Sequence, residues 1–294
     1  MPLPEFVDAH HHLWDLEAVH YPWLMARGER RFFGDPTPIQ KNYLLDDFLG
    51  EPGEYTPVAS VHIQVGADDG MAETAWLHAQ GSKPEAVVAF VDLAASDMEA
   101  TLSAQRSHNR VRGIRQIVGR HEEEDSKHGS DSLLTDSRWR AGLKTLEVTG
   151  LSFDLQMIPP QMPAVLDAID SVPDLPVALC HAGSPWDQSP EGLARWRDGL
   201  IAFAERPNTV CKISGLGMFN PDWSVDDLKP IVHTVIDVFS PARVMFGSNF
   251  PVDKLYRSYA DYWDAYDSLT GEFNVAERQA MFADNARRFY RMNG

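Results

Sequence analysis

Phe6-Val7-Asp8-Ala9-His10-His11-His12 begins as an apolar run and ends in three histidines. The apolar start is typical of a buried β-strand, and side chains alternate across a strand, so we expect Asp8, His10 and His12 on one face. Two imidazoles two residues apart at a strand end can bind one metal ion or polarise one substrate atom. A surface histidine cluster or a tag remnant is the alternative, and the surrounding strand pattern disfavours it.

Short apolar segments alternate with amphipathic ones along the rest of the chain. Segments with the length and the Val, Ile, Leu or Phe content of strands buried on both faces are Glu5–His10, Val58–Val65, Ala86–Leu93, Val111–Val118, Ser152–Met157, Pro176–His181, Thr209–Ser214 and Arg243–Ser248. Helical patterns occur at Met71–Gln80, Asp97–Ser107, Ser137–Thr149, Met162–Ile169, Pro190–Glu205, Val225–Phe239 and Val275–Met292, with Ser137, Ser189 and Ser224 as expected N-caps. Eight strands alternating with helices predict an α/β fold, a single (β/α)8 TIM barrel over residues 1–294.

Two further features bear on this architecture. An open doubly wound sheet, the alternative fold, needs a glycine-rich phosphate-binding turn after the first strand, where this chain has histidines. Residues 13–54, between the first two strands, are too many for a plain connection and rich in aromatic side chains. Because barrel active sites are built by loops at the carboxyl ends of the strands, we expect this segment to be a lid over the site. The alternative is a loop that packs outside the barrel. At the C-terminal end of the chain, we expect a helix over residues 275–294.

The overall composition limits the classes of partner. Hydrophobic residues make up 44% of the 294 residues, which is enough for a large core. The formal net charge of −17 repels nucleic acid and anionic lipid, and no apolar run is long enough to span a membrane. An anionic substrate would have to be bound by local Arg or Lys side chains. Cys180 and Cys211 lie in apolar runs, and with no secretory signal they indicate reduced thiols in a cytoplasmic protein.

Polar side chains lie at the carboxyl ends of most predicted strands, where barrel enzymes place their functional groups. In strand order these residues are His10, His12, His62, Gln64, Arg115, Asp154, Gln156, His181, Lys212 and Asn249. The sequence is equally compatible with a structural role for two of them. His62 could be a hydrogen-bonded core histidine, and Lys212 could be paired with a carboxylate. Asp154 and Gln156 are candidates to orient other residues only. His181 directly follows an apolar strand, so we expect it at the barrel mouth.

Seven short motifs occur in the order found in a known family: Asp8-Ala9-His10-His11-His12-Leu13-Trp14-Asp15, Tyr21-Pro22-Trp23-Leu24, Val111-Arg112-Gly113-Ile114-Arg115, the strand-six His181, Lys212-Ile213-Ser214-Gly215-Leu216, Val244-Met245-Phe246-Gly247-Ser248-Asn249-Phe250-Pro251 and Asn285-Ala286-Arg287-Arg288-Phe289-Tyr290. Together they resemble the amidohydrolase superfamily. The chain is most similar to the branch of TIM-barrel hydrolases that contains sugar-acid lactonases and 2-pyrone-4,6-dicarboxylate lactonase.

The resemblance implies that His10, His12 and His181 can hold a divalent metal such as zinc. The family's strand-eight aspartate, which takes a proton from the attacking water, is replaced by Asn249, and an amide cannot act as a general base. We expect Asp253 to bring its carboxylate into the vacated place; a loop carboxylate paired with Lys254 or Arg257 is the alternative. Arg115 and Gln156 end strands four and five, near which binuclear members carry a bridging lysine. We therefore expect one metal ion at most, weakly held or absent.

These expectations define a hydrolase that opens a small lactone or related cyclic ester. His10, His12 and His181 would polarise the carbonyl, and Asp253 or a histidine would activate water. Arg115 would bind a carboxylate, with Lys212, His62 and Gln156 also contacting substrate. Trp14, Tyr21 and Trp23 would cover the substrate ring. The expected partner is a small anionic or sugar-acid lactone, and the expected assembly is a monomer or homodimer. A metal-dependent decarboxylase of an aromatic or unsaturated acid, and a catalytically silent binding protein, are the alternatives.

Overall fold

Eight parallel strands form the centre of the molecule, for which a computed structural model describes residues 3–51, 53, 55–122, 124–125 and 132–292. In chain order the strands are β1 (Val7–His11), β2 (Ala59–Ile63), β3 (Ala86–Ala89), β4 (Val111–Ile117), β5 (Ser152–Gln156), β6 (Val177–Leu179), β7 (Thr209–Ile213) and β8 (Val244–Phe246). Each strand pairs in parallel with the next. The backbone N–H groups of Asn249 and His12 donate to the carbonyls of His10 and Phe250, each at 2.7 Å, and so join β1 to the chain after β8. The predicted TIM barrel is confirmed.

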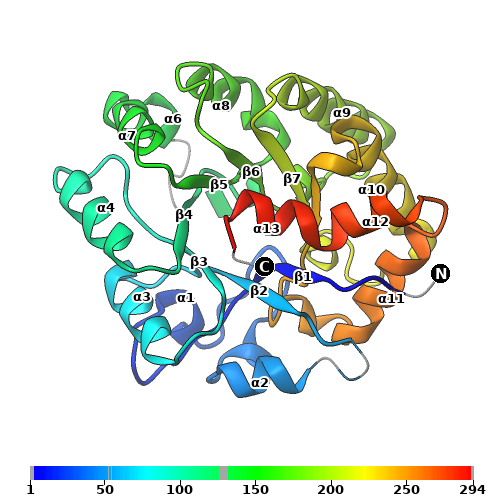
Figure 1. The fold of residues 1–294 in the computed structure, drawn as a ribbon, viewed down its shortest axis with the longest axis horizontal. Coiled ribbons are helices and arrows are strands. Elements are labelled where there is room, and N and C mark those ends of the chain that lie inside the picture. Colours follow the sequence, from blue (N-terminus) through cyan, green and yellow to red (C-terminus); the bar gives the residue numbers. More distant parts are fainter. Residues whose placement is uncertain (1–2, 52, 54, 123, 126–131, 293–294) are drawn as a thin grey trace.

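Helices surround this barrel (Figure 1). They are α1 (Pro22–Met25), α2 (Leu45–Gly50), α3 (Gly70–Ala79), α4 (Met98–Ser107), α6 (Ser132–Thr135), α7 (Ser137–Glu147), α8 (Met162–Ile169), α9 (Pro190–Ala204), α10 (Val225–Phe239), α11 (Tyr259–Leu269), α12 (Val275–Gln279) and α13 (Asn285–Phe289). A π-helical segment, η7 (Ala280–Asp284), joins the last two, so the expected C-terminal helix is interrupted. Ser189 and Ser224 cap their helices as predicted, whereas α7 is capped by Asp136 rather than Ser137.

The core has two parts. Small aliphatic side chains such as Val7, Ala9 and Val61 fill the barrel interior and pack against Ala286 and Tyr290 of the C-terminal segment. Figure 1 shows α13 crossing the barrel centre, where it covers the end at which the strands begin. A larger cluster, which includes Trp139, Trp196 and Trp263, fills the space between strands and helices.

The predicted domain, the predicted lid and the predicted C-terminal helix include residues outside the described ranges, namely 1–2, 52, 54, 123, 126–131 and 293–294. Cys180 and Cys211 are both buried and free, as predicted. Within the described ranges, no helix has the length and apolar character required to cross a membrane.

Candidate active site

Three histidines meet at the carboxyl ends of the strands. The ring centroid of His10 lies 5.1 Å from that of His12 and 4.5 Å from that of His181, and all three residues are buried. The pairing of β1 with β2 shifts register between Asp8 and His11, which changes the alternation of side chains in β1. The alternation predicted that Asp8 shares a face with His10 and His12, and this prediction is wrong. Its carboxylate instead accepts hydrogen bonds from the Ser248 N–H and the Tyr259 hydroxyl of α11.

His12 has a defined tautomer. Its Nδ1 lies 2.7 Å from the Ile63 carbonyl, which can only accept, so Nδ1 carries the proton. Burial, and then the positive charge of Arg115, lowers the pKa of His12 well below 6.5, so the ring is neutral and Nε2 has a lone pair. The structure places the Asn249 side-chain oxygen 3.2 Å from that Nε2, so that two acceptors would face each other. The amide satisfies His12 when its NH2 group donates to Nε2, and its oxygen then faces Asp253.

His10 has the most available imidazole of the three. Among the described residues, neither of its ring nitrogens has a hydrogen-bond partner, although both are buried. Burial, and then the charge of Lys212, lowers the pKa of His10 well below 6.5. The neutral ring therefore offers one N–H donor and one lone pair at the barrel mouth.

His181 is held by the end of β7. Its Nδ1 lies 3.1 Å from the Ser214 hydroxyl, and its pKa is also lowered well below 6.5 by burial and by Arg115. Gly215 has a φ of +68°, and a Cβ there would lie 2.4 Å from the His181 Nδ1. The glycine that follows Ser214 is thus required both for the turn and for the position of the imidazole.

Two cationic side chains lie beside the histidines. The Arg115 Nη1 donates to the Gln64 carbonyl at 2.9 Å and Nη2 donates to the Gln156 side chain, while Nε has no partner. The Lys212 ammonium donates to Asp154 at 2.6 Å, and both residues are fully buried. Lys212 is therefore paired with a carboxylate, the alternative left open by the sequence, and Gln156 orients Arg115. Lys212 acts on the site through its charge, which favours neutral His10 and His181.

Asp253 does not take the place of the missing strand-eight acid. Asn249 itself contacts His12, and Asp253 lies behind it, with its Oδ1 3.3 Å from the other end of the same amide, which is the oxygen in the orientation that satisfies His12. Complete burial raises the pKa of Asp253 from 3.8 to about 8. The carboxyl group is therefore protonated at neutral pH, and Asp253 positions Asn249 rather than facing a substrate.

Three residues expected to bind substrate have structural partners. His62 faces α3: its Nδ1 accepts from the Leu13 N–H at 3.1 Å, and its Nε2 lies 3.6 Å from Glu73. It is a core histidine, because residues that alternate with the interior Val61 point outward. Trp14 and Tyr21 are fully buried, and the ring of Trp14 lies 5.9 Å from that of Trp23 and 6.0 Å from that of Tyr43, so Trp14 packs within its own segment. Cover of a substrate ring by Trp14 and Tyr21 stays a prediction. Trp23 remains partly exposed, and its indole N–H donates to the Val65 carbonyl at 2.7 Å.

A contact group that the sequence did not single out joins segment 13–54 to the barrel mouth. The ring of Phe32 stacks with His121 and Phe219, at centroid distances of 5.9 and 6.4 Å. Next to it, the Tyr256 hydroxyl donates to the Phe33 carbonyl and Arg31 pairs with Glu124. The partners follow β4, β7 and β8, so residues 31–33 contact three loops at the carboxyl end of the barrel. The only sequence signal for this group was the aromatic pair Phe32-Phe33.

The donor set does not fit the expected metal centre. Among the described residues, no group of three or more His, Cys, Asp or Glu side chains is arranged to hold a metal ion. His10 and His12 keep nitrogen lone pairs, but the strand-eight position supplies a neutral amide that is bonded to His12. The positive charges of Lys212 and Arg115 also oppose a further cation next to His10.

Comparisons with known proteins agree with the fold. The chain belongs to the amidohydrolase family, whose model matches residues 7–292. An uncharacterised protein of Sinorhizobium fredii is 39% identical, over 97% of this chain and 98% of that protein. An L-fucono-1,5-lactonase of Burkholderia multivorans is 28% identical, over 97% of this chain and 95% of that enzyme. A crystal structure of a Burkholderia multivorans amidohydrolase with bound zinc has a TM-score of 0.83 at 25% identity, covering 99% of this chain and 100% of that one.

Proposed function

We propose that this protein hydrolyses a small lactone, with His10 as the group that activates water. The observation that carries the proposal is the neutral, fully buried His10 ring, which has two unpartnered nitrogens and lies beside His181. An imidazole with a free lone pair can accept a proton, and a neighbouring imidazole N–H can stabilise a developing oxyanion. The lactonase relative from Burkholderia multivorans supports a lactone as the substrate class.

The proposed reaction adds water across one ester bond. The water oxygen attacks the carbonyl carbon while His10 takes a proton from the water, and the carbonyl oxygen becomes an oxyanion that accepts a hydrogen bond from His181. The bond between the carbonyl carbon and the ring oxygen then breaks. His10 returns the proton to that ring oxygen, which leaves a hydroxy acid. The charge of Lys212 disfavours a lasting imidazolium at His10, so this proton return is favourable.

Arg115 is the proposed anion-binding residue of the site. Its Nε–H has no partner, and each Nη keeps a hydrogen beyond the one given to Gln64 or Gln156. A guanidinium with free hydrogens suits a carboxylate on the substrate or the carboxylate formed in the product. We infer a small, anionic or sugar-acid lactone as substrate and, from the two free thiols, a cytoplasmic location.

A panel of lactones tests the proposal, followed with a pH indicator that detects the acid produced. We expect His10→Gln to lower kcat/KM at least about 100-fold, which is the usual contribution of a general base. His233→Gln is the matched control, because that imidazole is partly exposed on α10 and bonds the Leu269 carbonyl. We expect this substitution to leave the rate unchanged. Thermal unfolding of both variants verifies the fold. Full activity in His10→Gln would contradict the assignment. Release of carbon dioxide from an unsaturated acid without lactone opening would contradict the reaction class.

A further inference from the structure

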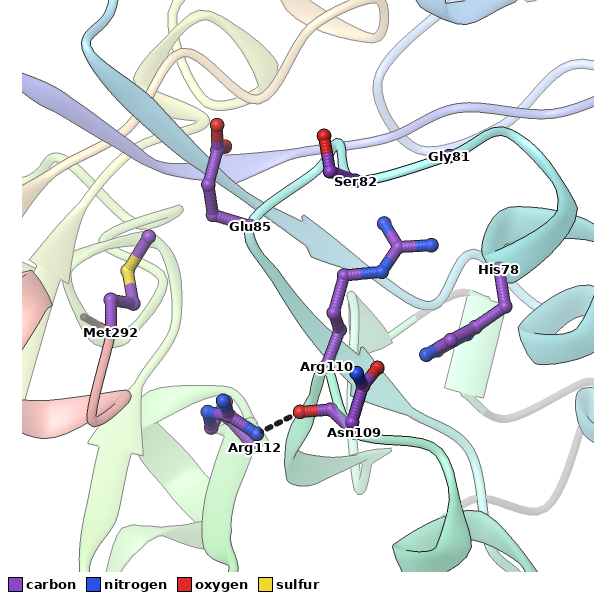
Figure 2. A pocket seen from close by; sticks show the side chains of 8 residues that line it. All are labelled: His78, Gly81, Ser82, Glu85, Asn109, Arg110, Arg112 and Met292. Carbon is purple, nitrogen blue, oxygen red and sulfur yellow. Dashed lines mark hydrogen bonds between the residues drawn. The ribbon is translucent and has the colours of Figure 1, made fainter.

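A polar cavity lies at the opposite end of the barrel from the histidines. It has a volume of about 520 Å³ and lies among the segments that lead into β3 and β4, next to Met292. Its polar lining consists of His78, Ser82, Glu85, Asn109, Arg110 and Arg112. Figure 2 shows the side chains of Arg110 and His78 entering the same space, with Ser82 on one side and Asn109 on the other. Cavities of this size bind small organic molecules.

Two guanidinium groups in this cavity lack a paired carboxylate. Arg110 donates to the Pro84 and Leu77 carbonyls, at 2.7 and 2.8 Å. Arg112 donates to the Asn109 and Val111 carbonyls, and its Nε has no partner. In the part of the chain that the structure describes, neither arginine forms an ion pair. Backbone carbonyls orient the two cations, and the Glu85 carboxylate acts on Arg110 through its charge without forming an ion pair.

The one carboxylate in the lining is already engaged. Glu85 accepts from the Lys83 ammonium through Oε1 and from the Ser60 N–H through Oε2, each at 2.9 Å. A further guanidinium, that of Arg291, donates to the Arg112 carbonyl, and burial and then the Arg112 charge lower the pKa of Arg291. The cavity is therefore locally basic in a chain whose net charge is −17. Arginines that form no ion pair and converge on a cavity favour an anionic ligand.

His78 adds a requirement for a hydrogen-bond donor on that ligand. Its Nδ1 lies 2.9 Å from the Thr74 carbonyl, so Nδ1 carries the proton. Its Nε2 is then an acceptor, and it is buried without a partner. A ligand hydroxyl could donate to this nitrogen while a carboxylate of the same ligand contacts an arginine. We propose that this cavity is a binding site for a small hydroxycarboxylate anion, separate from the candidate active site.

Malate and succinate test whether the site requires a ligand hydroxyl, because both carry two carboxylates and only malate has a hydroxyl. Isothermal titration at fixed ionic strength is expected to show one malate site and weaker binding of succinate. Arg112→Gln, which removes a charge, and Ser82→Glu, which adds a carboxylate at an exposed lining position, should each weaken malate binding about tenfold or more. Two variants are used so that a folding defect in one does not decide the result.

Three further variants locate the binding. Arg197→Gln on α9 and Ser103→Glu on α4 make the same chemical changes at exposed positions outside the cavity and should leave malate binding unchanged. Arg115→Gln should also keep the site, since that arginine lies at the barrel mouth. Loss of malate binding in Arg115→Gln would assign the ligand to the candidate active site and overturn the proposal. Unchanged binding in both cavity variants, equal binding of malate and succinate, or no saturable malate binding would also overturn it.

Discussion

Asp253 is an uncharged acid at neutral pH, because complete burial raises its pKa to about 8. A protonated Asp253 can donate to the side-chain oxygen of Asn249. The NH2 group of the same amide then donates to His12. This orientation satisfies all three groups, whereas a charged Asp253 would leave a carboxylate buried without a cation. We infer that Asn249 fixes the orientation of His12 and that Asp253 supports Asn249.

This assignment predicts how stability depends on pH. The pKa of Asp253 is higher in the folded chain, at about 8, than the ordinary value of 3.8, so the folded state binds a proton that the unfolded state releases. Its contribution to the free energy of unfolding is complete below pH 3.8 and is lost as the pH rises toward 8, by at most about 1.4 kcal/mol per pH unit. Urea unfolding can be measured between about pH 5 and pH 8, a range in which most proteins are stable. As the pH rises over this range, wild type should lose stability relative to Asp253→Asn.

The exposed Asp222→Asn is the control for this comparison, because it removes a carboxylate that is open to solvent. Its stability should follow that of wild type across the pH range. Parallel curves for wild type and Asp253→Asn would show that Asp253 is charged in the folded protein, and the proposed orientation of Asn249 would then be wrong.

The residues of the site differ in how far the sequence could predict them. His10, His12, His181 and Arg115 follow from the rule that barrel enzymes use the carboxyl ends of strands. The rule failed for Asp8 and His62, because counting alternate residues does not detect the register shift in β1 or determine which face of β2 is interior. Asn249 and His181 have φ values of +56° and +54°, and such turns redirect the chain in a way that residue spacing does not reveal.

At the scale of elements, alternating apolar and amphipathic segments were sufficient to predict all eight strands. Four described helices escaped prediction: the short α1, α2 and α6, and the longer α11. Helix α11 buries Tyr259, Tyr262, Trp263 and Tyr266, so its apolar face is aromatic rather than aliphatic. The capping box of Ser258 with Asp261 was the available signal. The interrupted C-terminal helix could not be predicted, because a π-helical turn changes the hydrogen bonding without changing the hydrophobic pattern.

Segment 13–54 is the element that we expect to control access to the site. His10, His12, His181 and Arg115 are each at most 4% exposed, so a substrate can reach them only if something moves. The Phe32 contacts with His121 and Phe219 are the aromatic contacts that hold residues 31–33 against the loops after β4 and β7. We therefore predict that Phe32→Ala loosens the cover, lowers kcat/KM about tenfold through poorer exclusion of water, and makes the segment more sensitive to proteolysis.

Leu49→Ala is the matched control for Phe32→Ala, because Leu49 belongs to the same segment and its side chain is exposed. It should change neither the rate nor the proteolysis. Faster turnover with normal proteolysis in Phe32→Ala would argue against a cover and favour a segment that packs only on the outside of the barrel.

At the scale of the whole molecule, one buried chain of polar groups connects the two ends of the barrel. The Tyr290 hydroxyl, from the segment that covers the end where the strands begin, donates to Asp154 at 2.7 Å. The same carboxylate oxygen accepts from Lys212, whose charge lowers the pKa of His10 at the other end. Because a buried ion pair is costly unless its remaining polar atoms are bonded, Tyr290 stabilises the pair that supplies this charge.

Tyr290→Phe removes only the hydroxyl, and we predict that it lowers the free energy of unfolding by about 1.5–3 kcal/mol, the range for a hydrogen bond to a charged group. Tyr55→Phe is the matched control, because the Tyr55 hydroxyl also donates to an aspartate, Asp264, but at an exposed position. Its loss should cost less than about 1 kcal/mol. Urea unfolding of both variants provides the measurement. Equal losses would show that the buried hydroxyl contributes no more than a surface one, and that the C-terminal segment stabilises the barrel through its apolar side chains alone.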